Sequence, residues 1–201
     1  MTQSRAPAAP VQGFSLFFSI TAALALATVA VLIAVPDRVE AVRLVIRSTA
    51  RISLALFLAA FLASTLARRW PSGSTRWLVC NRRWLGLGFA FSHLIHAVAI
   101  IALVRLDPQL FWTLSNPVSV AGGSICYLFI AAMAATSFDR MVQWIGPENW
   151  AKLHTTGCWI VWLVFVISNA KRIPGSAWYA LPSAVLITAA LLRLSVFRRT
   201  A

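Results

Sequence analysis

The sequence predicts an all-α polytopic membrane protein, built as a bundle of about six transmembrane helices. Of its 201 residues, 60% are hydrophobic and only 11% are charged, and the mean hydropathy is +0.79. An ordinary soluble domain is far less apolar. Long apolar stretches recur, each near the length of about 20 residues that an α-helix needs to cross about 30 Å of hydrocarbon. We therefore expect a single transmembrane domain over residues 1–201.

The first span is expected at about 13–35. It ends before Pro36, which cannot continue a helix, and its apolar stretch is too long for the core of a signal peptide. Residues 38–51 then alternate charged and apolar side chains. This pattern predicts a short amphipathic helix lying on the membrane surface.

The second span is expected at about 52–67, because Trp70 and the arginines before it mark an interface. The third, at about 84–104, follows Arg82 and Arg83. Each of these spans is therefore bounded by cationic side chains.

The last three spans are expected at about 118–137, 150–169 and 177–196. Asp139 closes the fourth span, and Pro174 separates the fifth from the sixth. Proline fits a connection because it lacks the N–H that a helix interior requires.

The net charge of +13 is expected to meet lipid headgroups and to set orientation, not to bind nucleic acid, because no basic face is interleaved with stacking surface. Lys and Arg are more numerous on the side of the bundle that holds both termini. This bias predicts cytoplasmic termini in a bacterial-type inner (plasma) membrane. The cations counted on that side are Arg5, Arg68, Arg69, Arg76, Arg82, Arg83, Arg140, Lys152, Arg193, Arg198 and Arg199.

All three histidines fall inside, or at the mouth of, expected spans. His93 and His96 lie on the third span and share a helix face, and His154 begins the fifth. Ionisable groups are costly in hydrocarbon, so those that remain are candidates for function. Imidazole is a common axial ligand of haem, which two facing helices could hold. The alternative is a histidine that packs and hydrogen-bonds.

Three sequence features resemble one known family, the ferric-reductase-like transmembrane domain. They are Arg51 opening the second span, Arg82-Arg83-Trp84-Leu85-Gly86-Leu87 followed by His96, and Trp150-Ala151-Lys152-Leu153-His154. The likeness extends from the second span through the sixth. Within the family, the chain is most similar to the haem-binding membrane subunits of bacterial periplasmic methionine sulfoxide reductase systems.

This resemblance implies one or two b-type haems between the third and fifth spans. His96 and His154 match the iron ligands, with His93 and Arg82 beside the haem or its propionates. Electrons would pass from a cytoplasmic flavin reductase or a membrane quinol to a periplasmic acceptor. Since the chain has no Rossmann-type glycine fingerprint, any flavin domain would belong to a separate partner.

The chain departs from the family pattern at Ile167, where a second histidine of the fifth span is expected. His96 and His154 cannot simply replace that pair, because they differ in depth by about 12 Å at 1.5 Å per residue. Three alternatives are left: ligation of haem by a single histidine at one level, ligation by His154 with help from Arg82, or a degenerate member that has lost one or both haems.

We expect an electron-transfer subunit without its own substrate-reducing site. Two alternatives stay open. A haem-free member of the family could act as a membrane assembly or interaction protein. A transporter or channel has less support, because Asp139 and Glu148 lie in a loop and no acidic residue lies inside a span.

Overall fold

The computed structural model describes residues 11–197 and is built from helices, which confirms the predicted fold class. Six of the helices are long and apolar enough to cross a membrane, so the chain is a multi-pass membrane protein. They are α1 (Phe14–Ala34), α2 (Arg38–Arg69), α3 (Gly73–Leu106), α5 (Pro117–Ala135), α7 (Pro147–Ala170) and α8 (Ala180–Phe197). The shorter elements are α4 (Pro108–Leu114), α6 (Asp139–Ile145), η1 (Ile173–Gly175) and η2 (Ala177–Tyr179).

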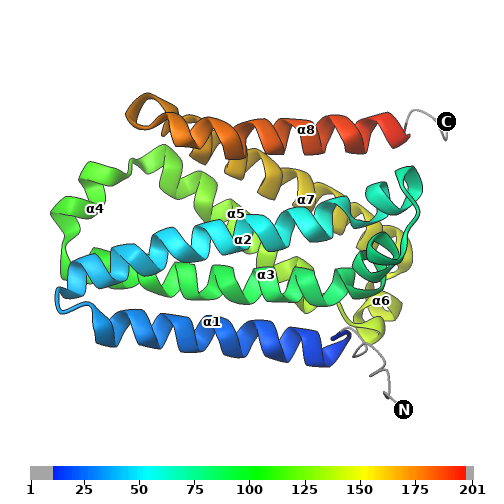
Figure 1. Cartoon of the computed structure of the whole chain (residues 1–201), viewed down its shortest axis with the longest axis horizontal. Helices are drawn as coiled ribbons and strands as arrows, with labels where there is room; N and C mark the ends of the chain where they lie inside the picture. The colour runs from blue at the N-terminus through cyan, green and yellow to red at the C-terminus, as the bar shows by residue number, and fades with distance from the viewer. Residues whose placement is uncertain (1–10, 198–201) are drawn as a thin grey trace, which may run out of the picture.

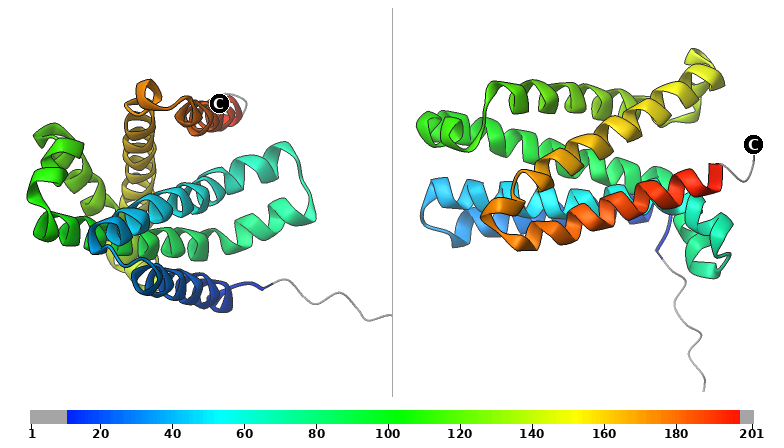
Figure 2. Two further views of the ribbon diagram at one scale, coloured as in Figure 1. Left: turned by 60° about the vertical axis from the view of Figure 1, so that its left-hand side comes forward. Right: turned by 90° about the horizontal axis from the view of Figure 1, so that it is seen from above.

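Helices α2 and α3 form a long antiparallel hairpin through the middle of the bundle (Figure 1). α1 packs along this hairpin on one side, while α5 and α7 pack together on the other (Figure 2). α8 contacts α2 and α7. We call the end where α1 begins, α6 lies and α8 finishes the α6 end, and the opposite one the α4 end (Figure 1).

The expected surface helix over residues 38–51 is wrong, because α2 runs unbroken from Arg38 to Arg69. The apolar side chains of this stretch are covered by protein and not by lipid. Val42 and Val45 are buried in a cluster with Ala99 and Leu103 of α3. An amphipathic pattern of this kind is compatible with burial against lipid or against another helix. Here the neighbouring helix α3 covers the apolar face. Helix α3 likewise begins before Trp84, at Gly73, where the Ser72 and Thr75 side chains form a capping box.

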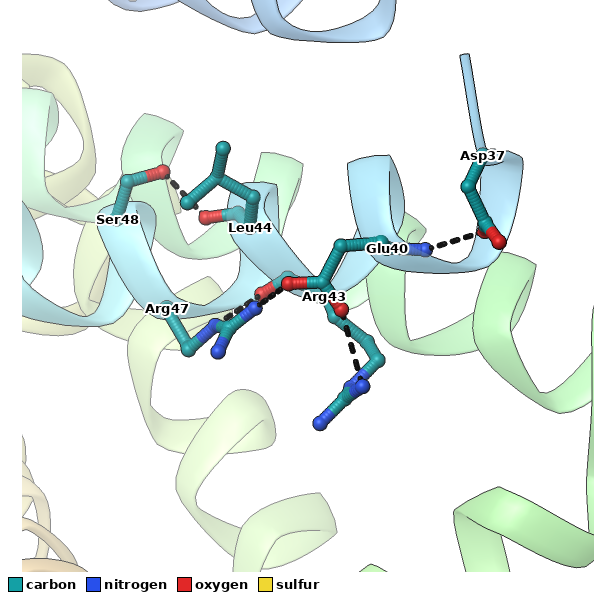
Figure 3. Close-up of polar contacts among 6 residues, drawn as sticks. All are labelled: Asp37, Glu40, Arg43, Leu44, Arg47 and Ser48. Atoms are coloured by element: carbon teal, nitrogen blue, oxygen red, sulfur yellow. Dashed lines mark hydrogen bonds and ion pairs between the residues drawn. The ribbon is translucent and has the colours of Figure 1, made fainter. Parts of the chain in front are cut away.

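The charged face of this first part of α2 is tied together by its own side chains (Figure 3). The Asp37 carboxylate caps the helix by accepting from the Glu40 backbone N–H at 2.9 Å. Glu40 also pairs with Arg43, at 3.0 Å, and with Arg47. The charges therefore remain on the outside of the bundle at the α4 end.

An aromatic core sets the lengthwise alignment of α2, α3 and α7. The Phe57 ring lies 5.6 Å from the ring of Phe89 on α3 and 5.5 Å from that of Phe165 on α7, measured between centroids. Phe61, one turn along α2, meets Trp159 of α7 edge to face. These contacts show which residues of α3 and α7 lie at the same depth.

Candidate functional site

A cavity of about 260 Å³ lies inside the α6 end of the bundle. Apolar side chains of α2, α3 and α5 form most of its wall, among them Phe57, Phe61, Phe89, Ile130 and Met133. Its polar lining consists of Arg82, Arg83, Ser137, Trp150, His154 and Cys158. The structure thus brings two of the predicted site residues, Arg82 and His154, to one cavity.

His154 is held in place by two neighbours. Its imidazole stacks on the Trp150 indole with centroids 4.3 Å apart, and its Nε2 lies 3.0 Å from Thr136 Oγ1. That hydroxyl already donates its single proton to the Ala132 carbonyl at 2.7 Å. With that bond made, the hydroxyl accepts from His154 Nε2–H, and the lone pair of the neutral ring is on Nδ1.

A second cavity, of about 200 Å³, adjoins the first and shares Phe61, Arg82, Trp150 and His154 with it. Its lining also includes Arg68 of α2 and Arg193 of α8. The sequence interpretation treated these two arginines only as orientation signals. Arg193 could have been recognised from the sequence, because it stands inside an apolar stretch, as the histidines do.

His96 has the opposite hydrogen-bonding arrangement from His154. Its Nδ1 lies 3.0 Å from Thr49 Oγ1 of α2, and that hydroxyl donates to the Val45 carbonyl at 2.6 Å. With that bond made, the Thr49 hydroxyl accepts from His96 Nδ1–H, and Nε2 carries the lone pair. His96 lines neither of the two cavities.

His93 lies within an aromatic cluster between α3, α5 and α7. Its ring centroid is 4.7 Å from that of Phe89, 5.7 Å from Phe165 and 5.6 Å from Tyr127. His93 Nδ1 and the Tyr127 hydroxyl are both buried, and neither has a hydrogen-bond partner in the described part of the chain. Like His96, His93 is absent from the lining of both cavities.

The structure does not bring His93 and His96 to the same place as His154. The α7 residue that meets His93 is Phe165, eleven positions beyond His154. At 1.5 Å per residue this separates the levels of His93 and His154 by about 16 Å. Within residues 11–197, no three His, Cys, Asp or Glu side chains are grouped so that they could hold a metal ion alone.

Comparison with known proteins identifies the family. A model described as ferric reductase like transmembrane component matches residues 49–166. The chain belongs to this family. The matched range runs from the middle of α2 to near the end of α7, and includes Arg82 and all three histidines. No curated protein and no solved structure matches the chain significantly. Family membership indicates a membrane electron-transfer component.

Ferric-reductase-like domains generally bind haem, and the lining of the cavity beside His154 has the chemical groups that suit haem. Its walls are apolar, His154 Nδ1 faces no hydrogen-bond partner among the described residues, and Arg82 supplies positive charge suited to propionates. Small residues, Gly86, Ala90 and Ala134, leave space along the lining. At the level of His93, by contrast, side-chain rings fill the region between α3 and α7.

Proposed function

We propose that this chain is a haem-b-binding subunit that carries electrons through a membrane oxidoreductase system and has no substrate-reducing site of its own. The observation that carries the proposal is the apolar cavity in which His154 and Arg82 meet inside a ferric-reductase-like bundle. When bound, haem supplies a one-electron redox couple at its iron. The resemblance also names His96 as a ligand, and this assignment stays a prediction.

The residues around the cavity have distinct tasks in this proposal. His154 would hold the haem iron, and Trp150 and Thr136 fix the plane of its ring. Arg82 and Arg83 attract the propionates. Phe57, Phe61 and Phe89 keep water away, which raises the strength of every electrostatic interaction inside.

The proposal includes two partners of this chain, an electron donor and an electron acceptor. With both termini cytoplasmic, the cavity faces the cytoplasm, where a flavin reductase or a membrane quinol would deliver electrons. The acceptor would be periplasmic. The likeness of Arg82-Arg83-Trp84-Leu85-Gly86-Leu87 to methionine sulfoxide reductase subunits supports a periplasmic molybdoenzyme as that acceptor.

A haem-free assembly or interaction protein is the second candidate, and one observation favours it. Ile167 stands where the resemblance expects a histidine, and its side chain is 44% exposed on the outside of the bundle. No haem ligand of α7 therefore faces His96, and the aromatic cluster around His93 occupies the space between the helices.

A reduced-minus-oxidised visible spectrum of the full chain in detergent, produced with ample haem, separates the two candidates. We expect a b-type band in the wild type, lost in His154→Ala and retained in Thr156→Ala, an exposed position on the same helix. His96→Ala tests the second assignment. Absence of the band from the wild type would establish the haem-free candidate, and its loss in His96→Ala alone would move the haem to the other level.

A further inference from the structure

We propose that Arg68, Arg82 and Arg193 bind the phosphate of an anionic phospholipid at the α6 end of the bundle. The three side chains come from α2, α3 and α8 and line the cavity of about 200 Å³. Ser64, Thr65 and Thr155 add hydroxyls to the lining, and none of the lining residues that the structure describes carries a carboxylate. Arginine forks and hydroxyls are the groups that recognise phosphate oxygens.

Arg193 is the residue that most requires an anion. Only 8% of its surface is exposed, although a guanidinium stays charged in proteins. One nitrogen donates to the Phe61 carbonyl at 2.8 Å, and the group lies over the Phe61 ring at 4.2 Å. Its Nε is buried and has no hydrogen-bond partner among residues 11–197. A cation–π contact attracts the charge but does not neutralise it, so a buried guanidinium in this setting calls for a counterion.

The chain's own acidic residues do not supply that counterion. The sequence contains five acidic residues, and Asp37, Glu40 and Asp107 lie at the α4 end. The two at the α6 end are already engaged: Asp139 pairs with Arg83, and Glu148 pairs with Lys152. No acidic side chain among residues 11–197 is therefore free to pair with Arg193, and we infer that the anion comes from another molecule.

The position of the cavity identifies the anion. It lies near the ends of α2 and α8, where headgroups of a bilayer are found, and basic pockets between transmembrane helices bind anionic headgroups. Haem propionates are the other source of oxyanions. Arg68 and Arg193, however, do not line the larger cavity beside His154, whereas Arg82 and Arg83 do. Lipid phosphate is thus the occupant favoured for the arginine cavity, and this inference does not depend on haem binding.

Native mass spectrometry of the full chain in neutral detergent tests the proposal, in haem-free and haem-loaded preparations. Phosphatidylglycerol is the probe and phosphatidylcholine the reference lipid. We expect phosphatidylglycerol to bind preferentially in both preparations. Arg68→Gln and Arg193→Gln should each weaken it about tenfold, the loss of one charge-assisted hydrogen bond. Arg69→Gln is the matched control, because Arg69 neighbours Arg68 but is outside the cavity.

Arg68 is exposed, so its substitution keeps the test valid where Arg193→Gln fails to fold. Equal binding of the two lipids, or equal losses in Arg68→Gln and Arg69→Gln, would overturn the proposal. So would unchanged phosphatidylglycerol binding together with loss of haem in Arg68→Gln, which would assign the arginines to propionates. Absence of haem from every preparation, with selective lipid binding intact, would contradict only the proposed function.

Discussion

Thr49 on α2 and His96 on α3 are joined by a hydrogen bond of 3.0 Å between the hydroxyl oxygen and Nδ1. One turn further along α2, the Ser53 hydroxyl donates to the Ser92 hydroxyl at 2.8 Å, and the Ser92 hydroxyl donates to the Thr49 carbonyl at 3.3 Å. The two longest helices thus share a buried polar strip within an otherwise apolar interface. In hydrocarbon such groups have no water to satisfy them, so each depends on its partner across the helix pair.

Thr49→Val should destabilise the bundle by about 1 kcal/mol, because it removes the hydrogen bond between the Thr49 hydroxyl and His96. Thermal or denaturant unfolding in detergent measures the change. Thr49→Ser keeps the hydroxyl and should retain most of the stability. Equal losses in the valine and serine variants would show that the Thr49 methyl group, and not the hydrogen bond, is the stabilising feature.

Gly157→Ala should narrow the cavity beside His154. A Cβ at position 157 would lie 2.6 Å from Met133 Sδ, which is too close, so Met133 must move. Met133 lines the cavity and its side chain is flexible, so we expect it to swing into the open space. Haem retention should fall more than stability does, as measured by the ratio of haem absorbance to protein and by unfolding.

Gly122→Ala is the control for this substitution, since a Cβ there meets nothing within 4 Å. The paired change Gly157→Ala with Met133→Ala removes the obstructing side chain and should restore haem binding. Loss of haem in the paired variant as well would show that Met133 itself contributes to binding.

Asn81→Ala should loosen the beginning of α1. The Asn81 side chain is fully buried, accepts from the Gly13 backbone N–H at 2.8 Å and donates to the Trp77 carbonyl at 2.9 Å. Gly13 has a φ of +68°, a conformation that suits glycine. We expect a loss of about 1–3 kcal/mol, the cost of a buried donor left unpaired.

Limited proteolysis near Gly13 provides the readout for Asn81→Ala, with unfolding in detergent as the second measurement. Asn116→Ala is a matched control, because the Asn116 side chain makes a local cap at the start of α5. Faster cleavage in the control than in Asn81→Ala would contradict the anchoring role of Asn81.

Apolar length was enough to predict the six spans, because hydrocarbon thickness sets the length of a crossing helix. It did not predict that α2 and α3 extend beyond them, since an amphipathic stretch can cover lipid or protein equally well. The structure brings His154 and Arg82 to one cavity and places His93 and His96 outside it, and sequence spacing alone did not separate these two groups. The contribution of Arg193 depends on the packing of α8 against α2, a contact between residues far apart in the sequence that local pattern does not encode.

Ile167→His should not create a second haem site, although it restores the residue type that the family resemblance expects at this position. The inward face of α7 at this level is occupied by Phe165, which is 9% exposed, whereas Ile167 is 44% exposed. Two residues turn a helix by about 200°, so an imidazole at position 167 would point away from His96. The haem-to-protein ratio of the purified variant should equal that of the wild type, with Ile167→Gln as the polar control. A higher ratio that is lost again on adding His96→Ala would mean that α7 rotates to bring position 167 toward α3, and that the His93 level holds haem after all.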